Sequence, residues 1–425
     1  MINVVDFGAV GDGVTMCTVS FEKAVAEAVK TKGAVTVPAG IYLTGTINLR
    51  GASLHLEKGA VIKASPNLED YPVQDFVHNE MGALRALIVC LGGQDVTIDG
   101  EGTIDLNGKS FYKTDAFQVP PSRVPFTEEQ IAECTYSYDD RPTQSIFFDK
   151  VQNLRVKGIT VLDAPCWTFT FTECENVKVM GLTVRTDMNV PNDDGMHFCS
   201  CRGVIISDCN IESGDDCIAI TAITNWAKPC EDVVITNCVL KTCSKAIAIG
   251  YIYSHIRNVL IDNVIIKESN RGLCFMSNPE CGLIENVRVK NLIIDTRVAA
   301  GNWWGNGEPI YVLGIRHDYG IPPEQKPRRD TEVNFKNIHF DSITCTGENA
   351  IAIAGTGDNI KGMTFRDIDV SLKESKNLPL KGRTMDTAPA KTVYEIPDNC
   401  GFYINGADNI VLENVDLGSH ILVQE

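Results

Sequence analysis

Short runs of alternating apolar and polar residues recur along most of the chain. An Asn, Asp or Gly precedes three or four mostly β-branched positions, a turn residue follows, and a second short β-branched run completes the unit. Clear copies begin at Asn153, Asn176, Gly203, Asp232, Asn258 and Asn286, with weaker ones near Asp95, Asn334, Asn359 and Asn409. The clear copies are about 23 to 29 residues apart, a spacing typical of stacked repeats.

Each unit predicts short strands in which inward Val, Ile and Leu alternate with outward polar residues. Gly, Asn and Asp supply the turns because they tolerate a positive φ. One unit cannot bury its apolar face alone, whereas coils of a parallel β-helix, stacked about 4.8 Å apart, can. We therefore predict an all-β fold, a single-stranded parallel β-helix forming one domain over residues 1–425. Helical repeats are disfavoured because almost no segment has a 3.6-residue apolar period.

One segment near the N-terminus departs from this pattern. The stretch SFEKAVAEAVK, from Ser20 to Lys30, predicts an amphipathic helix with Ser20 as its N-cap. Its apolar face contains Phe21, Ala24, Val25, Ala28 and Val29. We expect this helix to cover the open end of the solenoid, within an N-terminal cap region at residues 1–45.

Two longer segments lack the repeat. Residues 107–145 are rich in Tyr, Phe and Pro, and residues 299–331 contain NWWGNGEPIYV and a Pro-rich stretch. Long insertions in repeat proteins form loops on one face, often the binding face. We expect both insertions to form the walls of a cleft and to close one of its ends.

The charge balance excludes several partners. The 425 residues include 55 Asp and Glu against 38 Lys and Arg, a formal net charge of −17. Contacts to phosphate need clusters of Lys and Arg, so nucleic acid and anionic membranes are disfavoured. The initial MINVVD has neither the basic nor the apolar region of a signal peptide, and no apolar run is long enough to span a bilayer. We expect a cytoplasmic protein, for which a homo-oligomer remains open.

Sixteen cysteines lie mostly within apolar stretches, and we expect them to be reduced and buried. Cys199 and Cys201 form a C-x-C pair, with Cys209 and Cys217 nearby. A metal site is the alternative interpretation of this group, but the spacing is a weak signal and favours stacked core cysteines.

Two acidic motifs carry the candidate chemistry. NDDGMHF at residues 192–198 and SGDDCIAI at residues 213–220 are about one repeat apart, so Asp194 should lie beside Asp215 and Asp216 on one external face. Clustered carboxylates raise one another's pKa, which suits glycoside hydrolysis: one acid protonates the leaving oxygen while others activate water. Asp is also common in β-helix turns, and spacing alone leaves both interpretations open.

These motifs, together with VVDFGAVGDG at residues 4–13, YDDRPTQSIFF at 138–148 and APCWTF at 164–169, resemble the polygalacturonase family, glycoside hydrolase family 28. The resemblance covers most of the chain and implies a right-handed parallel β-helix. It also implies hydrolysis with inversion, for which carboxyls stand about 6.5–9.5 Å apart.

By this resemblance Asp215 is the general acid, and Asp194 and Asp216 position and deprotonate the water. Asp193 either tunes their charge and contacts substrate or is a turn residue. His197 follows closely and is expected to support Asp194.

The chain departs from the family pattern at two places. Lys245, in Ser244-Lys245-Ala246, stands where the family has His. One coil later the family Arg and Lys that bind the substrate carboxylate are replaced within Gly272-Leu273-Cys274-Phe275-Met276. A carboxylate in a cleft needs cations or several donors, so a neutral sugar becomes as plausible as a uronate. Lys245 either replaces one positive charge or pairs with Asp194 or Asp216.

Further substrate-binding candidates lie in and near the second insertion. Trp303 and Trp304 could stack on a sugar face, or one of them could anchor the loop. Glu308 could bind sugar hydroxyls, and Arg271 lies close to the altered segment in sequence. Weaker candidates are Trp167, His317 and Arg316.

The sequence therefore predicts an inverting glycoside hydrolase that needs no metal or organic cofactor. We expect exo action on a plant-derived, pectin-related oligosaccharide or glycoside. One alternative is a Ca²⁺-dependent polysaccharide lyase, in which the paired aspartates bind Ca²⁺ and Lys245 is the base. Another is a non-catalytic carbohydrate-binding β-helix, since fold alone does not fix function.

Overall fold

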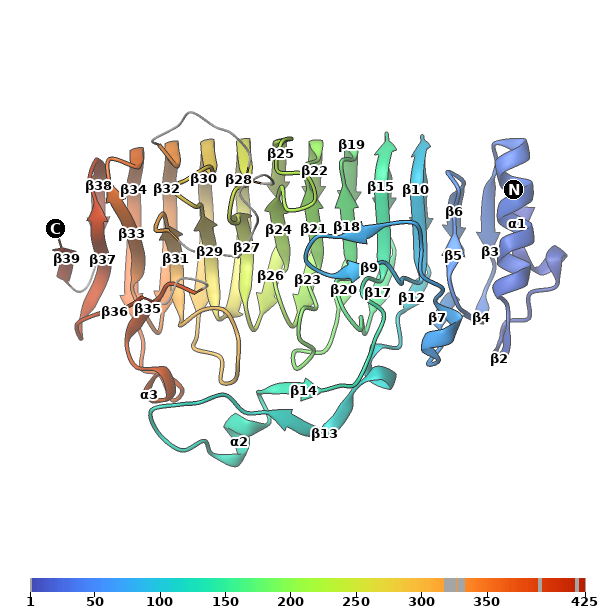
Figure 1. The fold of residues 1–425 in the computed structure, drawn as a ribbon, viewed down its shortest axis with the longest axis horizontal. Coiled ribbons are helices and arrows are strands. Elements are labelled where there is room, and N and C mark those ends of the chain that lie inside the picture. Colours follow the sequence, from blue (N-terminus) through green and yellow to red (C-terminus); the bar gives the residue numbers. More distant parts are fainter. Residues whose placement is uncertain (1, 317–325, 327–332, 389–391, 417–419, 425) are drawn as a thin grey trace.

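The computed structural model describes residues 2–316, 326, 333–388, 392–416 and 420–424. Its strands wind into a right-handed parallel β-helix, with the axis of the coils lying along the long dimension of the molecule (Figure 1). Each strand pairs in parallel with the equivalent strand of the next coil, which gives three long stacks. The predicted fold class is confirmed.

The first stack carries the face on which the acidic motifs lie. Its strands are β5 (Ile47–Asn48), β10 (Ile88–Gln94), β15 (Ile146–Gln152), β18 (Phe169–Thr172), β21 (Met196–Cys199), β24 (Ile218–Thr221), β27 (Lys245–Gly250), β29 (Arg271–Met276), β31 (Glu308–Leu313), β33 (Ile351–Gly357), β37 (Cys400–Ala407) and β39 (His420–Gln424).

The second stack runs beside it along the whole molecule. It comprises β1 (Ile2–Asn3), β3 (Ala34–Val37), β6 (Ser53–Leu56), β11 (Thr97–Gly100), β16 (Arg155–Lys157), β19 (Glu175–Met180), β22 (Arg202–Ser207), β25 (Cys230–Thr236), β28 (His255–Ser269), β30 (Leu283–Thr296), β32 (Phe335–Gly347), β34 (Ile360–Leu372) and β38 (Ile410–Asp416).

The third stack closes each coil and merges with the second at β28, whose length serves both stacks. Its separate strands are β2 (Asp12–Met16), β4 (Gly40–Thr44), β7 (Ala60–Ala64), β12 (Thr103–Asp105), β17 (Thr160–Leu162), β20 (Thr183–Arg185), β23 (Asn210–Ser213) and β26 (Val239–Thr242).

The repeat pattern explains both the core and the turns. Inward Val, Ile, Leu and Phe from successive coils form one continuous buried cluster along the axis. The residue that opens each clear copy adopts a left-handed turn, with φ of 55° at Asn153, 54° at Asn176 and 59° at Asn258. Asn tolerates this conformation better than most residues. Neighbouring turns are also linked, because Asn176 Nδ2 donates to Asn153 Oδ1 over 3.2 Å.

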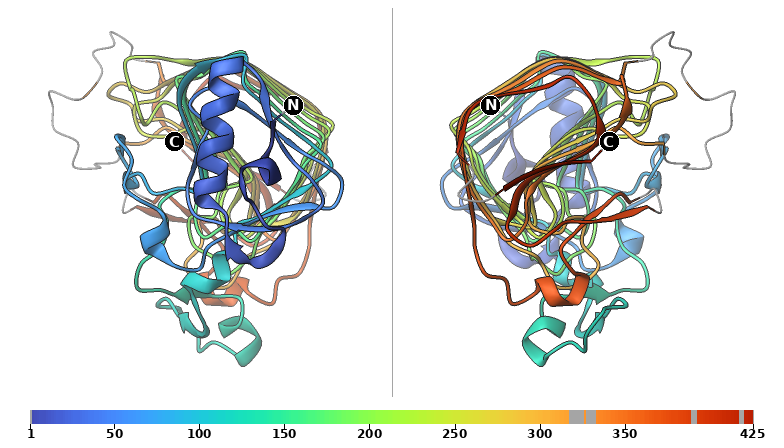
Figure 2. Two further views of the ribbon diagram at one scale, coloured as in Figure 1. Left: turned by 90° about the vertical axis from the view of Figure 1, so that its right-hand side faces the viewer. Right: turned by 90° about the vertical axis from the view of Figure 1, so that its left-hand side faces the viewer.

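Helix α1 (Thr18–Thr31) covers the N-terminal end of the coils, as the end view in Figure 2 shows. Two details of the sequence prediction were wrong. The N-cap is Cys17, three residues before Ser20, and Ser20 lies inside the helix as a buried residue. Val29, assigned to the apolar face, is 44% exposed. The cap residue is held by a tertiary contact, in which Cys17 N donates to Leu43 O over 2.8 Å, and the helical pattern does not contain this contact.

Three antiparallel hairpins project from the coils (Figure 1). They are β8 (Val77–His78) with β9 (Gly82–Ala83), β13 (Lys113–Gln118) with β14 (Thr135–Ser137), and β35 (Thr384–Asp386) with β36 (Val393–Glu395). The short helices α2 (Glu128–Ile131) and α3 (Leu378–Lys381) lie beside the last two, and 3-10 turns occur at Val4–Phe7, Leu68–Asp70 and Gly108–Phe111. Within the described ranges, no helix combines the length and apolarity needed to cross a bilayer.

All sixteen cysteines are buried, as predicted for most of them, and none forms a disulfide bond. The C-x-C pair does not form a common site. Cys201 lies in the central core, whereas Cys199 packs outside it against Cys166 and Trp167, because β21 ends at Cys199 and a left-handed turn at Ser200, with φ of 53°, interrupts the alternation of a strand. Among the residues that the structure describes, no three His, Cys, Asp or Glu side chains are grouped so as to hold a metal ion.

Candidate active site

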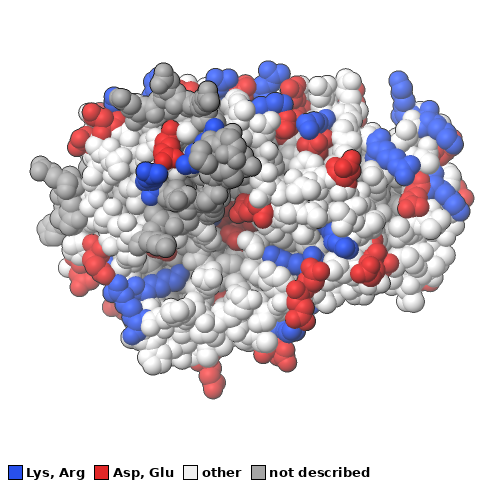
Figure 3. Space-filling model, in the orientation of Figure 1, with Lys and Arg blue, Asp and Glu red and all other residues white. Residues whose placement is uncertain are grey.

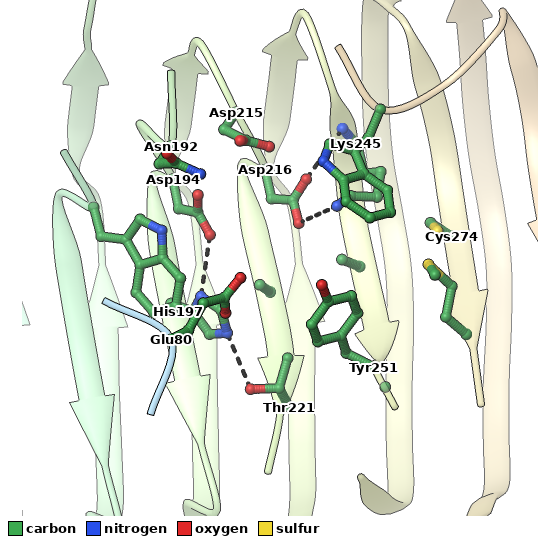
Figure 4. A pocket seen from close by; sticks show the side chains of 16 residues that line it. Glu80, Asn192, Asp194, His197, Asp215, Asp216, Thr221, Lys245, Tyr251 and Cys274 are labelled. Carbon is green, nitrogen blue, oxygen red and sulfur yellow. Dashed lines mark hydrogen bonds and ion pairs between the residues drawn. The ribbon is translucent and has the colours of Figure 1, made fainter. Parts of the chain in front are cut away.

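A pocket on the face of the first stack brings the two acidic motifs together (Figure 4). Asp194, Asp215 and Asp216 line it from the turns that precede β21 and β24, and Lys245 lines it from the start of β27. The pocket holds about 540 Å³ of empty space, including its open mouth. Figure 3 shows acidic side chains in a recess near the middle of this face.

Backbone hydrogen bonds between adjacent coils set the relative positions of these side chains. Gly195 N donates to Asp216 O over 2.8 Å, and Cys217 N donates to Lys245 O over 3.1 Å. Asp194, Asp216 and Lys245 are therefore held on neighbouring coils by the same ladder that builds the fold.

The glycines of both acidic motifs allow the turns to approach their neighbours. A Cβ at Gly195 would lie 2.6 Å from the Cys217 carbonyl oxygen, and one at Gly214 would lie 2.4 Å from the Val190 carbonyl oxygen. Any side chain at these positions would push the adjacent coil away. Gly195 and Gly214 thus position the aspartates through the backbone.

Asp216 is the most constrained carboxylate of the cluster. Lys245 Nζ lies 2.9 Å from its Oδ2, and Ser244 Oγ donates to its Oδ1 over 3.2 Å. Burial raises the pKa of Asp216, Lys245 lowers it and Asp215 raises it again, and the result is about 7. Burial alone would lower the pKa of Lys245, but Asp216 and Asp215 raise it above its usual value, so the ammonium stays charged. Trp304 covers this ammonium, with the ring centroid 5.0 Å from Nζ.

Asp194 is held by a chain of hydrogen bonds. Its Oδ2 lies 3.0 Å from His197 Nδ1, and His197 Nε2 lies 3.0 Å from Thr221 Oγ1. The imidazole also stacks on Trp167, with ring centroids 4.0 Å apart. Burial raises the pKa of Asp194 well above its ordinary value, and Asp215 and Asp216 raise it further. Burial lowers the pKa of His197, so a neutral imidazole positions Asp194.

Asp215 completes the group of three aspartates. Figure 4 shows it above Asp194 and Asp216, with its carboxyl facing the same space. It is 9% exposed, more than Asp194 at 5% or Asp216 at 6%. Besides burial, the charge of Asp215 raises the pKa of both Asp194 and Asp216.

Glu80 is a fourth acidic group of the pocket, and the sequence analysis missed it. It arrives on the β8–β9 hairpin, more than a hundred residues before the acidic motifs. Glu80 is an exposed residue, but desolvation of its carboxyl by the pocket raises its pKa, Lys245 lowers it, and Asp215 and Asp216 raise it again, to about 7. No repeat position or motif marks this residue, so only the folded hairpin could reveal it.

Two predicted substrate contacts have to be corrected. Arg271 is 2% exposed and Glu308 is fully buried, and they bind each other through two hydrogen bonds of 3.2 and 3.1 Å. The residues are in register on the adjacent strands β29 and β31. Their side chains are thus occupied beneath the surface and do not line the pocket.

Asp193 and Trp303 also lie outside the pocket. Asp193 is fully buried, and Thr168 Oγ1 donates to its Oδ1 over 3.4 Å. Trp303 is 6% exposed and donates from Nε1 to Glu133 O over 3.2 Å, so it anchors the loop. The two tryptophans therefore differ in role: Trp303 anchors the loop, and Trp304 lines the pocket.

The segment that departs from the family pattern reaches the pocket. Cys274 and Met276 line it together with Ala248 and Tyr251, which gives an apolar wall. Of the weaker candidates, Trp167 lines the pocket and Arg316 binds Glu280 at 2.9 Å. His317 lies outside the described residues.

The two insertions contribute unequally to this pocket. Residues 299–331 supply Trp304, whereas among the described residues 107–145 none lines it. Arg141 of the first insertion acts one step away, because its Nη2 donates to Asn192 Oδ1 over 3.0 Å. Asn192 itself lines the pocket, so Arg141 supports the turn that carries the first acidic motif.

The model of the glycosyl hydrolases family 28 matches residues 28–382 of the chain. The chain therefore belongs to this family and is a glycoside hydrolase. It is 28% identical over 363 residues to a probable polygalacturonase of Vitis vinifera, covering 80% of this chain and 69% of the relative. It is 25% identical over 405 residues to an exo-poly-α-D-galacturonosidase of Dickeya chrysanthemi, covering 85% of this chain and 65% of that protein.

Solved structures show the same fold. The exopolygalacturonase of Thermotoga maritima superposes with a TM-score of 0.66 at 22% identity, covering 88% of this chain and 87% of that one. A polygalacturonase from Erwinia carotovora gives a TM-score of 0.63 at 18% identity, with coverage of 86% and 93%.

Proposed function

We propose, because the chain belongs to glycosyl hydrolase family 28, that it removes a terminal sugar from a pectin-related oligosaccharide or glycoside with inversion. Asp215 is the general acid, and Asp194 and Asp216 position and deprotonate the attacking water. The observation that carries this proposal is the meeting of the three carboxyls in one pocket.

The reaction breaks the glycosidic bond and forms a bond between the anomeric carbon and the water oxygen. Asp215 gives its proton to the glycosidic oxygen as the bond to the anomeric carbon breaks. A water attacks that carbon from the opposite face and passes its proton to the carboxylate of Asp194 or Asp216. Lys245, 2.9 Å from Asp216, favours the ionised carboxylate that must accept this proton.

The lining of the pocket supports a neutral sugar. Cys274 and Met276 present apolar surface, and the only cation lining the described pocket, Lys245, is already paired with Asp216. A uronate would enter a site with four acidic groups and no available positive partner. Burying a carboxylate under those conditions is unfavourable.

One further feature supports exo action, and another supports a reducing compartment. The β8–β9 hairpin is hydrogen-bonded to the coils beside the pocket, since Asn79 Nδ2 donates to Ile223 O over 2.6 Å, and it limits the space at that side. Sixteen buried cysteines that form no disulfide bond suit the cytoplasm, where thiols remain reduced. Small imported oligosaccharides or glycosides are then the accessible substrates.

The test uses a panel of pectin-related oligosaccharides and of neutral and uronic glycosides, with NMR of the first anomer released. We expect hydrolysis from the chain end with inversion, and a loss of about 10²–10⁴-fold in kcat/KM for Asp215→Asn. Asp208→Asn, on an exposed turn with φ of 57°, is the matched control and should retain activity.

Three outcomes would contradict the proposal. Retention of configuration would exclude the direct attack of water. Unsaturated products with chelator sensitivity would indicate a lyase. Tight glycan binding without turnover in the wild type would indicate a non-catalytic protein.

A further inference from the structure

We propose that Glu80 is a substrate-binding residue that accepts hydrogen bonds from the hydroxyls of the sugar above the aspartates and disfavours a uronate there. This inference rests on the proposed glycoside hydrolysis and specifies the chemistry by which the same pocket selects its sugar. It assigns a function to the β8–β9 hairpin.

The turn that carries Glu80 is fixed in place. His78 Nδ1 accepts hydrogen bonds from Glu80 N over 3.2 Å and from Met81 N over 3.1 Å. The His78 ring also packs edge-on against Trp167, with centroids 4.9 Å apart. Trp167 in turn stacks on His197, so the hairpin is attached to the wall that holds Asp194.

The Glu80 carboxyl is free to accept a ligand. Asp194 is occupied by His197, and Asp216 is occupied by Lys245 and Ser244. Across the described part of the chain, by contrast, no group donates a hydrogen bond to the Glu80 carboxyl. Figure 4 shows it directed toward the middle of the pocket. A bound sugar would therefore find an unused acceptor in Glu80.

The surrounding charges explain the selectivity. Glu80 shares the pocket with Asp194, Asp215, Asp216, neutral His197 and Lys245. With Lys245 paired to Asp216, the charge of Glu80 adds repulsion against a second carboxylate. Sugar hydroxyls are donors and incur no such repulsion. Because the pKa of Glu80 is about 7, this charge grows as the pH rises through neutrality.

Two variants separate charge from hydrogen bonding. Glu80→Ala removes both, and we expect kcat/KM on the neutral glycoside to fall about 10- to 100-fold. Glu80→Gln keeps the size and one acceptor oxygen but removes the charge. We expect it to raise the ratio of uronide to neutral-glycoside kcat/KM by about tenfold. Asp75→Asn, an exposed acid before the same hairpin and outside the pocket lining, is the matched control.

The pH dependence gives a readout that a merely structural residue would not change. In the wild type the preference for the neutral glycoside should increase as pH rises through 7, because Glu80 becomes ionised. In Glu80→Gln the same ratio should stay flatter across this range. Thermal unfolding of each variant checks that the fold persists, and the near-isosteric Glu80→Gln keeps the test valid if Glu80→Ala is unstable.

The outcomes distinguish this inference from the proposed function. If the wild type hydrolyses glycosides but both Glu80 variants behave like Asp75→Asn, the role of Glu80 is wrong and the hydrolase proposal stands. A wild type that cleaves only uronides contradicts the selectivity assigned to Glu80. A wild type that cleaves no glycoside overturns the proposed function, and this inference with it.

Discussion

Two buried pairs of opposite charge lie on neighbouring coils of the first stack. Lys245 is in register with Arg271, and Arg271 is in register with Glu308. Lys245 pairs toward the N-terminus with Asp216, at 2.9 Å, whereas Arg271 pairs toward the C-terminus with Glu308, at 3.1 Å. The same ladder of strands thus places two similar pairs side by side.

Their surroundings differ. Three more acidic groups surround Asp216, and its pKa of about 7 lets it exchange protons near neutrality. Glu308 has two guanidinium hydrogen bonds and a third from Asn306 N at 2.7 Å, while Tyr311 covers the guanidinium at 3.5 Å. The comparison shows that the two carboxylates differ in their access to a pocket and in the number of acids around them, although both are paired with a cation.

Removing the carboxylate charge should lower activity in the Asp216 pair and leave it nearly unchanged in the Glu308 pair. Asp216→Asn takes away an acceptor for the proton of the water, so we expect kcat/KM to fall about 10²–10⁴-fold. Glu308→Gln should leave kcat/KM close to the wild-type value in the protein that folds. Both are measured on the glycoside that the wild type hydrolyses best, and equal losses would abolish the distinction.

Removing the cation from each pair should destabilise the protein more at the Arg271 pair than at the Lys245 pair. Arg271→Met leaves a buried Glu308 charge without its partner, so the free energy of unfolding should fall by about 3–5 kcal/mol. Lys245→Met should cost less, because Asp216 faces the pocket and takes up a proton readily. Urea unfolding followed by circular dichroism measures both losses.

A double variant provides the control for this stability measurement. Arg271→Met combined with Glu308→Leu removes both charges and should recover most of the lost stability. If the double variant is as unstable as Arg271→Met alone, shape rather than charge governs the site.

The smallest expected effect is a shift of the pH profile. Lys245 lowers the pKa of Asp216, so Lys245→Met should raise that pKa, and the acidic limb of kcat/KM should move to higher pH by about one unit or more. Lys241→Met, which removes a partly exposed lysine paired with Glu268 on the preceding strand, should leave the limb unchanged. A shift to lower pH would contradict the pairing of Lys245 with Asp216.

The local sequence pattern was sufficient to predict the coils and one part of the site. Asn153 and Asn176 mark turns because their conformation depends mainly on the residue itself. The one-period separation of Asp194 from Asp216 was informative because stacking is periodic. Whether Asp216 is the base, however, stays a proposal, since placement does not reveal a proton transfer.

The sequence by itself determined the stack, the turns, the burial of the cysteines and the alignment of the two acidic motifs, since each follows from short-range alternation repeated at a fixed period. Tertiary structure alone decided that Arg271 and Glu308 bind each other, that Trp303 anchors while Trp304 lines the pocket, and that Glu80 reaches across the coils. These outcomes depend on which residues of adjacent strands come into register, on the path of a loop outside the repeat and on how a non-repeating hairpin folds back, and a local period encodes none of them.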